Sequence, residues 1–373
     1  MVARLVLRTA ALAALSGCIG SGKQHAAPDA SARGPAASAP PPAPTPPPAA
    51  NTQPGIDGKA LYERYCDFCH GKEGQGYAAD EAPALANDVF LSIATDAYIH
   101  DAILKGRPGT TMSAWGKQKG GPLDGKDADA IVSYVRAWQK QAPVALTPRE
   151  PKGDAARGAK TYAAKCAGCH GAKGSGGKYN ALGNAELLAS ASDAFLAATI
   201  ERGRPGTPMP AFGDKLSHAD VDDVLALLRS WQKAPDPNVD LPPKPGKLEN
   251  VVIHPKGKPA SFPEGADFVK VDVVKAAVDA GSSLIIVDAR APGDYATMHV
   301  AGAISVPFYT VNDYAAQIPK DRWILTYCAC PHAASVKARD ALRALGYKNV
   351  AVLDEGINVW RDKGYPVRGG SKP

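Results

Sequence analysis

The feature that most constrains this chain is an internal repeat built around two five-residue motifs. Residues 66–70 (CDFCH) recur as residues 166–170 (CAGCH), an offset of 100 residues. Downstream, residues 106–110 and 203–207 share the sequence Gly-Arg-Pro-Gly-Thr, an offset of 97 residues. Because the offset stays nearly constant along the chain, the sequence predicts two copies of one domain.

Each copy is predicted to be a small all-α domain. Asp57 and Asp154 are placed to cap helices that run into the two cysteine motifs. Ser217 and Asp220 have the spacing of a capping box. The apolar residues at helical spacing near the end of each copy are Ile131, Val135 and Trp138 in the first, and Val221, Val224, Leu225, Leu228 and Trp231 in the second. Since this aliphatic core is small, each copy is expected to need a cofactor or a covalent staple.

The C-x-x-C-H spacing is typical of covalent attachment of c-type haem. Two thiols one helical turn apart add to the two vinyl groups of one porphyrin, and the adjacent histidine then faces the iron. The candidate residues are Cys66, Cys69 and His70 for one haem, and Cys166, Cys169 and His170 for the other. Zinc is the chemical alternative, but it needs further Cys or His ligands, which neither copy offers at matching positions.

The sixth ligand of each iron is predicted from the methionines. Met112 and Met209 lie 42 and 39 residues after their histidines, and both follow a stiff Arg-Pro-Gly-Thr segment. Such a loop can hold a thioether over one face of a porphyrin, and His/Met ligation raises the reduction potential of the haem. Arg107 and Arg204 in these loops are candidates to pair with haem propionates, with solvated loop arginines as the alternative.

These motifs resemble the class I c-type cytochromes over residues 55–142 and 152–234, and the pairing is similar to the di-haem subunits of haem–copper oxidases. The resemblance implies thioether bonds at the four motif cysteines, axial His/Met ligation, two covalently bound haem c groups and redox protein partners. In this family a Pro after the motif often offers its carbonyl to the histidine. Pro83 is the candidate in the first copy, whereas the second copy has Asn180 in that region.

From about residue 266 the pattern changes to short apolar runs separated by helical stretches, which predicts a parallel α/β sheet. The expected strands lie at 284–287, 303–306, 323–327 and 350–353, and the expected helices around 272–280, 311–318, 335–345 and 356–363. Cys328 and Cys330 follow the third strand and precede a helix. Backbone N–H groups converge at such a place and favour the thiolate.

This region, residues 266–369, resembles the rhodanese (sulfurtransferase) family. The residues that carry the resemblance lie at 287–290 (VDAR), 301–304 (AGAI), 353–360 (LDEGINVW) and 364–367 (GYPV). The resemblance implies that Cys328 is the nucleophile that holds a sulfane sulfur as a persulfide, with thiosulfate or a persulfide as donor. No arginine ends the loop, so phosphatase activity is not expected. Cys330 could instead be the nucleophile, or it could be a resolving thiol that forms a disulfide with Cys328. The last alternative is that the cysteine is inert and buried in a domain that only binds partners.

The first 17 residues have the charged start and short apolar core of a secretory signal. The sequence Leu-Ser-Gly-Cys at 15–18 resembles a bacterial lipobox, which implies lipidation of Cys18, periplasmic location and, since Ile19 is not Asp, preference for the outer membrane. An ordinary signal peptide is the alternative. Residues 18–54 are predicted to be a Pro/Ala-rich tether. A second Pro-rich linker is predicted at 235–265, and it is expected to keep the domains flexible while letting them meet.

Composition narrows the partners further. The net charge is +6 and there is no long Lys/Arg run, so no nucleic-acid partner is expected. The sequence has no run of 18 uncharged apolar residues, so no bilayer-spanning helix is expected. The sequence as a whole predicts two all-α cytochrome domains followed by an α/β rhodanese-like domain. We expect a thiol of the rhodanese-like domain to bind or transfer sulfane sulfur, and the haems to accept the electrons released when the sulfur is oxidised. The alternatives are a plain di-haem carrier whose rhodanese-like domain only docks partners, and a thiol redox sensor at Cys328 and Cys330.

Overall fold

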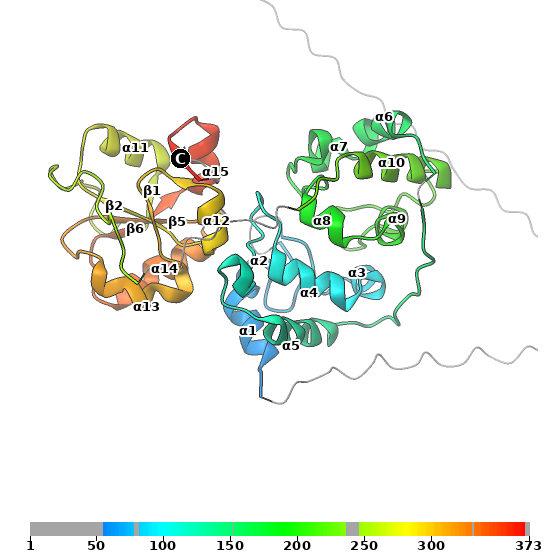
Figure 1. The fold of residues 1–373 in the computed structure, drawn as a ribbon, viewed down its shortest axis with the longest axis horizontal. Coiled ribbons are helices and arrows are strands. Elements are labelled where there is room, and N and C mark those ends of the chain that lie inside the picture. The colour runs from blue at the N-terminus through cyan, green and yellow to red at the C-terminus, as the bar shows by residue number, and fades with distance from the viewer. Residues whose placement is uncertain (1–54, 78–81, 151, 236–245, 330–331, 370–373) are drawn as a thin grey trace, which may run out of the picture. The chain divides into compact units, whose positions relative to one another are not determined.

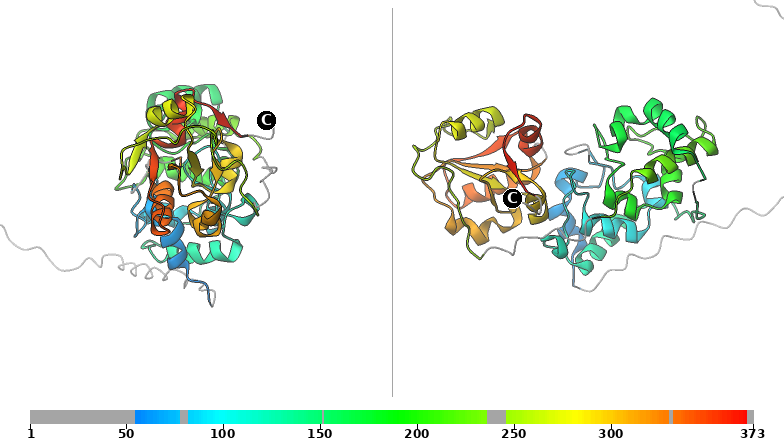
Figure 2. Two further views of the ribbon diagram at one scale, coloured as in Figure 1. Left: turned by 90° about the vertical axis from the view of Figure 1, so that its left-hand side faces the viewer. Right: turned by 45° about the horizontal axis from the view of Figure 1, so that its top comes forward.

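The computed structural model describes residues 55–77, 82–150, 152–235, 246–329 and 332–369. The predicted signal peptide, Cys18, the 18–54 tether and Cys330 lie outside the described residues and stay predictions. The helices of both repeat copies come before residue 231, and the strands of the named sheets come after residue 267 (Figure 1). The right-hand view of Figure 2 also shows the strands confined to the C-terminal part of the chain. None of the helices among the described residues is long and apolar enough to cross a membrane.

The first copy is a small helical domain. Its helices are α1 (Gly58–Tyr65), α2 (Asp67–His70), α3 (Asp88–Ile93), α4 (Asp96–Lys105), η1 (Lys117–Lys119) and α5 (Gly125–Arg136). The side chain of Asp57 accepts a hydrogen bond from the backbone of Ala60, so the predicted cap is present. Helix α1 packs against α5, and Tyr62 from α1 meets Trp138 edge to face with ring centroids 5.1 Å apart.

The second copy repeats this arrangement with few changes. Its helices are α6 (Ala155–Lys165), α7 (Ala167–His170), η2 (Ala172–Gly174), α8 (Ala185–Ser190), α9 (Asp193–Arg202) and α10 (His218–Ser230). Asp154 caps α6, and the predicted capping box of Ser217 and Asp220 starts α10. Tyr162 meets Trp231 edge to face at 5.0 Å, as its counterpart does in the first copy. The predicted pair of all-α domains is confirmed.

The two copies contact each other through equivalent residues. Asn87 donates its side-chain amide to the carbonyl of Pro205 at 2.9 Å, and Asn184 donates to the carbonyl of Pro108 at 2.9 Å. Since Asn184 and Pro205 are the repeat counterparts of Asn87 and Pro108, the contact is reciprocal, like the interface of a two-fold dimer. The loops that carry Met112 and Met209 therefore both lie beside this contact.

The C-terminal region contains a five-stranded parallel sheet in the order β1-β6-β5-β2-β4, and a separate antiparallel pair β3-β7. The strands are β1 (Phe268–Lys270), β2 (Ile285–Asp288), β3 (His299–Val300), β4 (Ile304–Ser305), β5 (Ile324–Tyr327), β6 (Val350–Asp354) and β7 (Val367–Arg368). The four predicted strands correspond to β2, β4, β5 and β6, and the predicted α/β class is confirmed.

Helices cover both faces of this sheet. They are α11 (Val271–Asp279), α12 (Pro292–Thr297), η3 (Phe308–Thr310), α13 (Val311–Tyr314), η4 (Ala315–Gln317), α14 (Ala333–Ala344) and α15 (Gly356–Asp362). In Figure 1, α11 and α15 lie on one face and α13 and α14 on the other. The central strands β2 and β5 are buried along their whole length, as expected for a parallel sheet that is covered on both sides.

Candidate haem sites and thiol site

The two C-x-x-C-H motifs have the same backbone conformation. Cys66 ends α1 and begins α2 with φ −123° and ψ −36°, and Cys166 does the same between α6 and α7 with φ −121° and ψ −38°. The backbone N–H of Cys69 donates to the carbonyl of Cys66 at 3.2 Å, and the matching bond from Cys169 is 3.1 Å. Both motifs thus form a single tight turn, which keeps the two thiols and the following histidine close together.

A backbone carbonyl orients each histidine ring. Nδ1 of His70 lies 2.9 Å from the carbonyl of Pro83, as the sequence predicts. In the second copy, Nδ1 of His170 lies 2.9 Å from the carbonyl of Asn180, so a non-proline residue supplies the same contact. Because a carbonyl only accepts, Nδ1 carries the proton in both rings and Nε2 is left as the ligand atom. Burial lowers the pKa of both imidazoles, which favours the neutral form that binds metal.

The methionine loops are held by one set of hydrogen bonds that appears twice. The N–H of Arg107 donates to the carbonyl of Met112 at 2.8 Å, and the Thr110 hydroxyl accepts from the N–H of Met112 at 3.1 Å. The equivalent distances in the second copy, between Arg204 and Met209 and between Thr207 and Met209, are 2.9 Å and 3.2 Å. Both methionines are half-buried. The loops therefore present the two thioethers in the same way.

Two arginines, Arg107 buried and Arg204 half-buried, test whether these sites suit haem. Arg107 is 9% exposed, and its side chain donates to the carbonyl of Gly106. Arg204 donates to the carbonyl of Gly203 and to the Thr199 hydroxyl, and burial lowers its pKa to about 10. Among the described residues, no carboxylate lies within ion-pair distance of either guanidinium. A buried cation needs an anionic partner, and the propionates of haem c meet this need, so the residues fit the group.

The zinc alternative finds no support in the thiols. Over the described ranges, no three His, Cys, Asp or Glu side chains are grouped to hold a metal ion. Burial raises the pKa of the Cys66 thiol to about 12 and also raises that of Cys166. Zinc binds the thiolate, whereas these surroundings favour the neutral thiol.

The candidate thiol of the C-terminal domain lies at the end of a buried strand. Cys328 follows β5, is 1% exposed, and its Sγ is 3.3 Å from the hydroxyl of Ser335 on α14. Next to it, the carboxylate of Asp288 accepts two bonds from the guanidinium of Arg290 and one from the Tyr327 hydroxyl. All these groups are buried, so the network fixes the carboxyl ends of β2 and β5 on which the cysteine loop stands.

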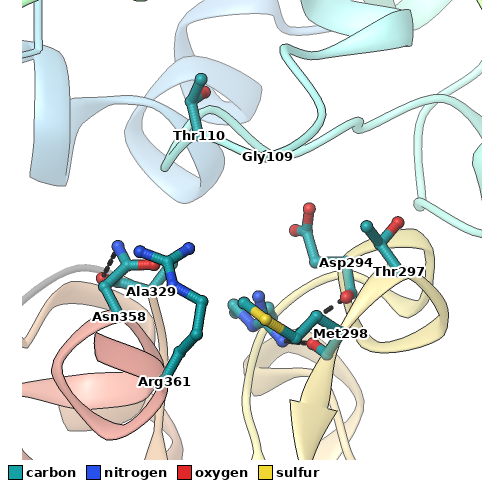
Figure 3. Close-up of a pocket in the computed structure, with 9 residues that line it drawn as sticks. Gly109, Thr110, Asp294, Thr297, Met298, Ala329, Asn358 and Arg361 are labelled. Carbon is teal, nitrogen blue, oxygen red and sulfur yellow. Dashed lines mark hydrogen bonds between the residues drawn. The ribbon is translucent and has the colours of Figure 1, made fainter. Parts of the chain in front are cut away.

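A small pocket opens beside this loop (Figure 3). Asn358 on α15 donates to the carbonyl of Ala329 at 3.0 Å and so holds the residue that follows Cys328. The residues that line the pocket are Gly109, Thr110, Arg290, Asp294, Thr297, Met298, Ala329, Asn358 and Arg361. Gly109 and Thr110 belong to the Met112 loop of the first copy, a neighbour that the sequence did not predict because only the folded chain brings them together.

Two histidines of the C-terminal domain, His299 and His332, pack against aromatic rings. His299 stacks on Tyr295 with ring centroids 3.8 Å apart. His332 packs against the ring of Phe268, and its Nε2 lies 3.6 Å from Asp354. Neither contact directs an imidazole at Cys328, so no general base for the thiol is assigned to them.

Comparisons with known proteins agree with both parts of the structure. Residues 54–135 and 153–228 match the family described as cytochrome C oxidase, cbb3-type, subunit III. Residues 270–363 match the rhodanese-like domain. Among solved structures, the rhodanese-like domain of an Anabaena protein is 28% identical with a TM-score of 0.26, covering 28% of this chain and 82% of that one.

Two curated relatives are oxidase subunits. The chain is 32% identical over 191 residues to the cbb3-type cytochrome c oxidase subunit CcoP of Azospirillum sp. (strain B510), covering 46% of this chain and 60% of the relative. It is 35% identical over 182 residues to subunit FixP of Azorhizobium caulinodans, covering 47% and 58%. The chain thus spans about three fifths of the length of these relatives. The two repeat copies are therefore cbb3-type cytochrome c domains, and the C-terminal region is a rhodanese-like domain.

Proposed function

We infer that this protein is a di-haem electron carrier with a sulfur-handling thiol on its rhodanese-like domain. The observation that carries the inference is the duplicated site, in which a carbonyl-oriented histidine, a hydrogen-bonded methionine loop and an arginine recur together, and no carboxylate of the described residues pairs with that arginine. The residues proposed to hold the two haem c groups are Cys66, Cys69, His70 and Met112, and Cys166, Cys169, His170 and Met209.

Bound haem c supplies reversible one-electron transfer, and its His/Met ligation raises the reduction potential. The chain prepares for this role in three ways. The carbonyls of Pro83 and Asn180 fix the ring orientation and raise the basicity of Nε2. Arg107, which is buried, and Arg204, which is half-buried, provide positive charge for the propionates. The names of the curated relatives place them in oxidases, which supports redox proteins as the partners of this chain.

The thiol chemistry is proposed for Cys328. Its thiolate attacks the outer sulfur of thiosulfate, one S–S bond forms, the S–S bond of thiosulfate breaks, and sulfite leaves, so a persulfide remains on the protein without any change in electron count. With hydrosulfide, the same thiolate forms one S–S bond and releases one proton and two electrons, which is the number that two one-electron carriers accept. The position of Cys328 at the carboxyl end of β5 supports this role.

The location of the protein is also a proposal. The charged start, the apolar stretch and the Leu-Ser-Gly-Cys sequence at 15–18 support export, lipidation of Cys18 and anchoring in the periplasm, with the outer membrane favoured. Maturation of c-type cytochromes and the use of sulfur anions are both compatible with that compartment.

One alternative has a specific observation in its favour. Cys328 is almost fully buried, which is also expected of a structural cysteine in a domain that only docks partners. A thiosulfate:cyanide sulfurtransferase assay separates the two readings, because a docking domain with intact thiols gives no thiocyanate above the Cys328→Ser background. The sensor reading requires Cys330 and is tested by counting alkylated thiols before and after reduction.

The proposed coupling predicts that anaerobic addition of sulfide reduces the haems of the wild-type protein at least tenfold faster than those of Cys328→Ser. The rate that remains in the variant is the direct reaction of sulfide with haem, so the variant supplies its own background. Stopped-flow absorbance of the haem bands measures both rates, and Cys330→Ser tells which thiol is needed. Equal rates in wild type and Cys328→Ser would contradict the coupling and leave a plain electron carrier.

A further inference from the structure

The two haem motifs are lined by different residues, although their backbones are the same. Before and inside the first motif stand Tyr65, Asp67 and Phe68. The matching positions of the second motif are Lys165, Ala167 and Gly168. Two large aromatic side chains on one face of a small domain need cover from water. The first copy therefore carries an apolar face that the second copy lacks.

Aromatic residues of the rhodanese-like domain provide that cover. Phe308 in η3 lies edge to face against Phe68 with ring centroids 5.8 Å apart, and it also meets Tyr65 at 6.4 Å and Trp115 at 6.2 Å. Tyr309 contacts Tyr65 edge to face at 5.8 Å. Phe308 is buried as a result. Aromatic pairs in such geometry stabilise the contact beyond the apolar area that they bury.

A lysine of the same domain adds a charged contact. Lys337 on α14 places its Nζ 4.3 Å from the centre of the Phe68 ring, 3.1 Å from the carbonyl of Arg64 and 3.9 Å from a carboxylate oxygen of Asp67. The acceptor Asp67 is Ala167 in the second copy, and the ring of Phe68 is absent at Gly168. Both side chains of the first cytochrome domain that Lys337 contacts, those of Asp67 and Phe68, are thus specific to the first motif.

A second contact involves the methionine loop of the first copy. Gly109 and Thr110 of that loop line the pocket beside Ala329 and Asn358 (Figure 3). Asp294 at the same place is hydrogen-bonded to the side chain of Ser113. The counterpart of Ser113 in the second copy is Pro210, which has no side-chain donor. The two contacts together cover both the cysteine motif and the methionine loop of the first copy.

The second copy leaves its motif open. Lys165, Gly168 and Cys169 are exposed, and α7 has no buried residue, whereas His70 in the matching helix α2 is 7% exposed. Lys173 nearby is exposed as well.

We propose that the rhodanese-like domain docks on the haem-motif face of the first cytochrome domain, where Phe308 and Lys337 hold it. The motif face of the second cytochrome domain is then the one that binds an external redox protein. This assignment differs from the flexible arrangement expected from the Pro-rich linker. It places the pocket beside Ala329, the residue that follows Cys328, against the loop of Met112. The docking itself does not rest on the proposed sulfur chemistry.

The test uses the full-length protein and a zero-length carbodiimide cross-linker, followed by peptide mass spectrometry. The wild type is expected to give a Lys337–Asp67 cross-link. The variant Tyr65→Lys/Phe68→Gly copies the second motif, so haem attachment is retained while the aromatic contact is lost, and its cross-link yield is expected to fall at least tenfold. Hydrogen exchange in η3 and α14 rises in the same variant.

A matched control is Gly168→Ala, which changes the open motif at a position with no atom within 4 Å of the new methyl group. It is expected to leave the cross-link and the exchange pattern unchanged. Absence of the cross-link in the wild type, or a yield that Tyr65→Lys/Phe68→Gly does not change, would overturn the docking. Neither result depends on whether sulfide reduces the haems, so failure of the proposed function is recognised separately.

Discussion

Replacing Met112 with histidine is expected to lower the reduction potential of one haem by about 0.2 V and to leave the other unchanged. Axial ligands control potentials over a range of roughly 0.8 V, and a thioether holds the potential above that of a nitrogen ligand. The loop around Met112 is held by hydrogen bonds of the backbone and of Thr110, so the substitution changes the ligand without removing those bonds. A spectroelectrochemical titration with two resolved waves measures the shift.

The chain offers a matched control for this substitution. Met298 is the only methionine besides Met1 that lies outside the two predicted ligand positions, and it lines the pocket of the rhodanese-like domain. Met298→Leu is expected to change neither wave. If Met112→His leaves both potentials at their wild-type values, Met112 is not an iron ligand.

Gly58→Ala is expected to destabilise the first cytochrome domain by about 3 kcal/mol, the upper end of the usual cost of overpacking. Helices α1 and α5 cross so closely at this point that an added Cβ would lie 2.1 Å from the carbonyl oxygen of Ala130. This neighbour is helix backbone, which cannot rotate away as a side chain can, so the two helices must move apart. Gly158 has the same role against Asp223 in the second domain, at 2.0 Å.

Gly125→Ala is the matched control, because Gly125 is also the first residue of a helix and its nearest contact for a new methyl group is 3.7 Å away. It is expected to change stability by less than about 0.5 kcal/mol. Thermal unfolding followed by the haem absorbance compares the two variants, and 3 kcal/mol corresponds to roughly 15 °C for a domain of this size. Equal midpoints for Gly58→Ala and Gly125→Ala would contradict the close crossing.

The repeat made much of the helical region predictable. The caps at Asp57 and Asp154 and the capping box at Ser217 are local patterns, and the structure has all three. The carbonyl of Pro83 was also predictable, because it depends on a nearby residue of recognisable type. The carbonyl of Asn180 was not, since any residue type can supply a backbone oxygen if the chain passes the ring at the right distance.

In the C-terminal domain, the sequence predicted the four strands that lie within apolar runs, β2, β4, β5 and β6. It missed β1, β3 and β7, which are two or three residues long and are not fully buried, so no apolar run marks them. It also gave no signal for the contact between Phe308 and Phe68, which joins positions 240 residues apart and depends on how two separate domains pack. The difference between Phe68 and Gly168 was visible in the repeat, and it is the one local sign of that contact.

The central claim is that two haem groups are covalently attached to each chain, one at each C-x-x-C-H motif. The most direct test is the intact mass of protein from cells able to mature c-type cytochromes, read together with the double variant Cys66→Ala/Cys69→Ala. The account predicts a polypeptide carrying two haems in the wild type and one in the variant. A wild-type mass with one haem or none would contradict it.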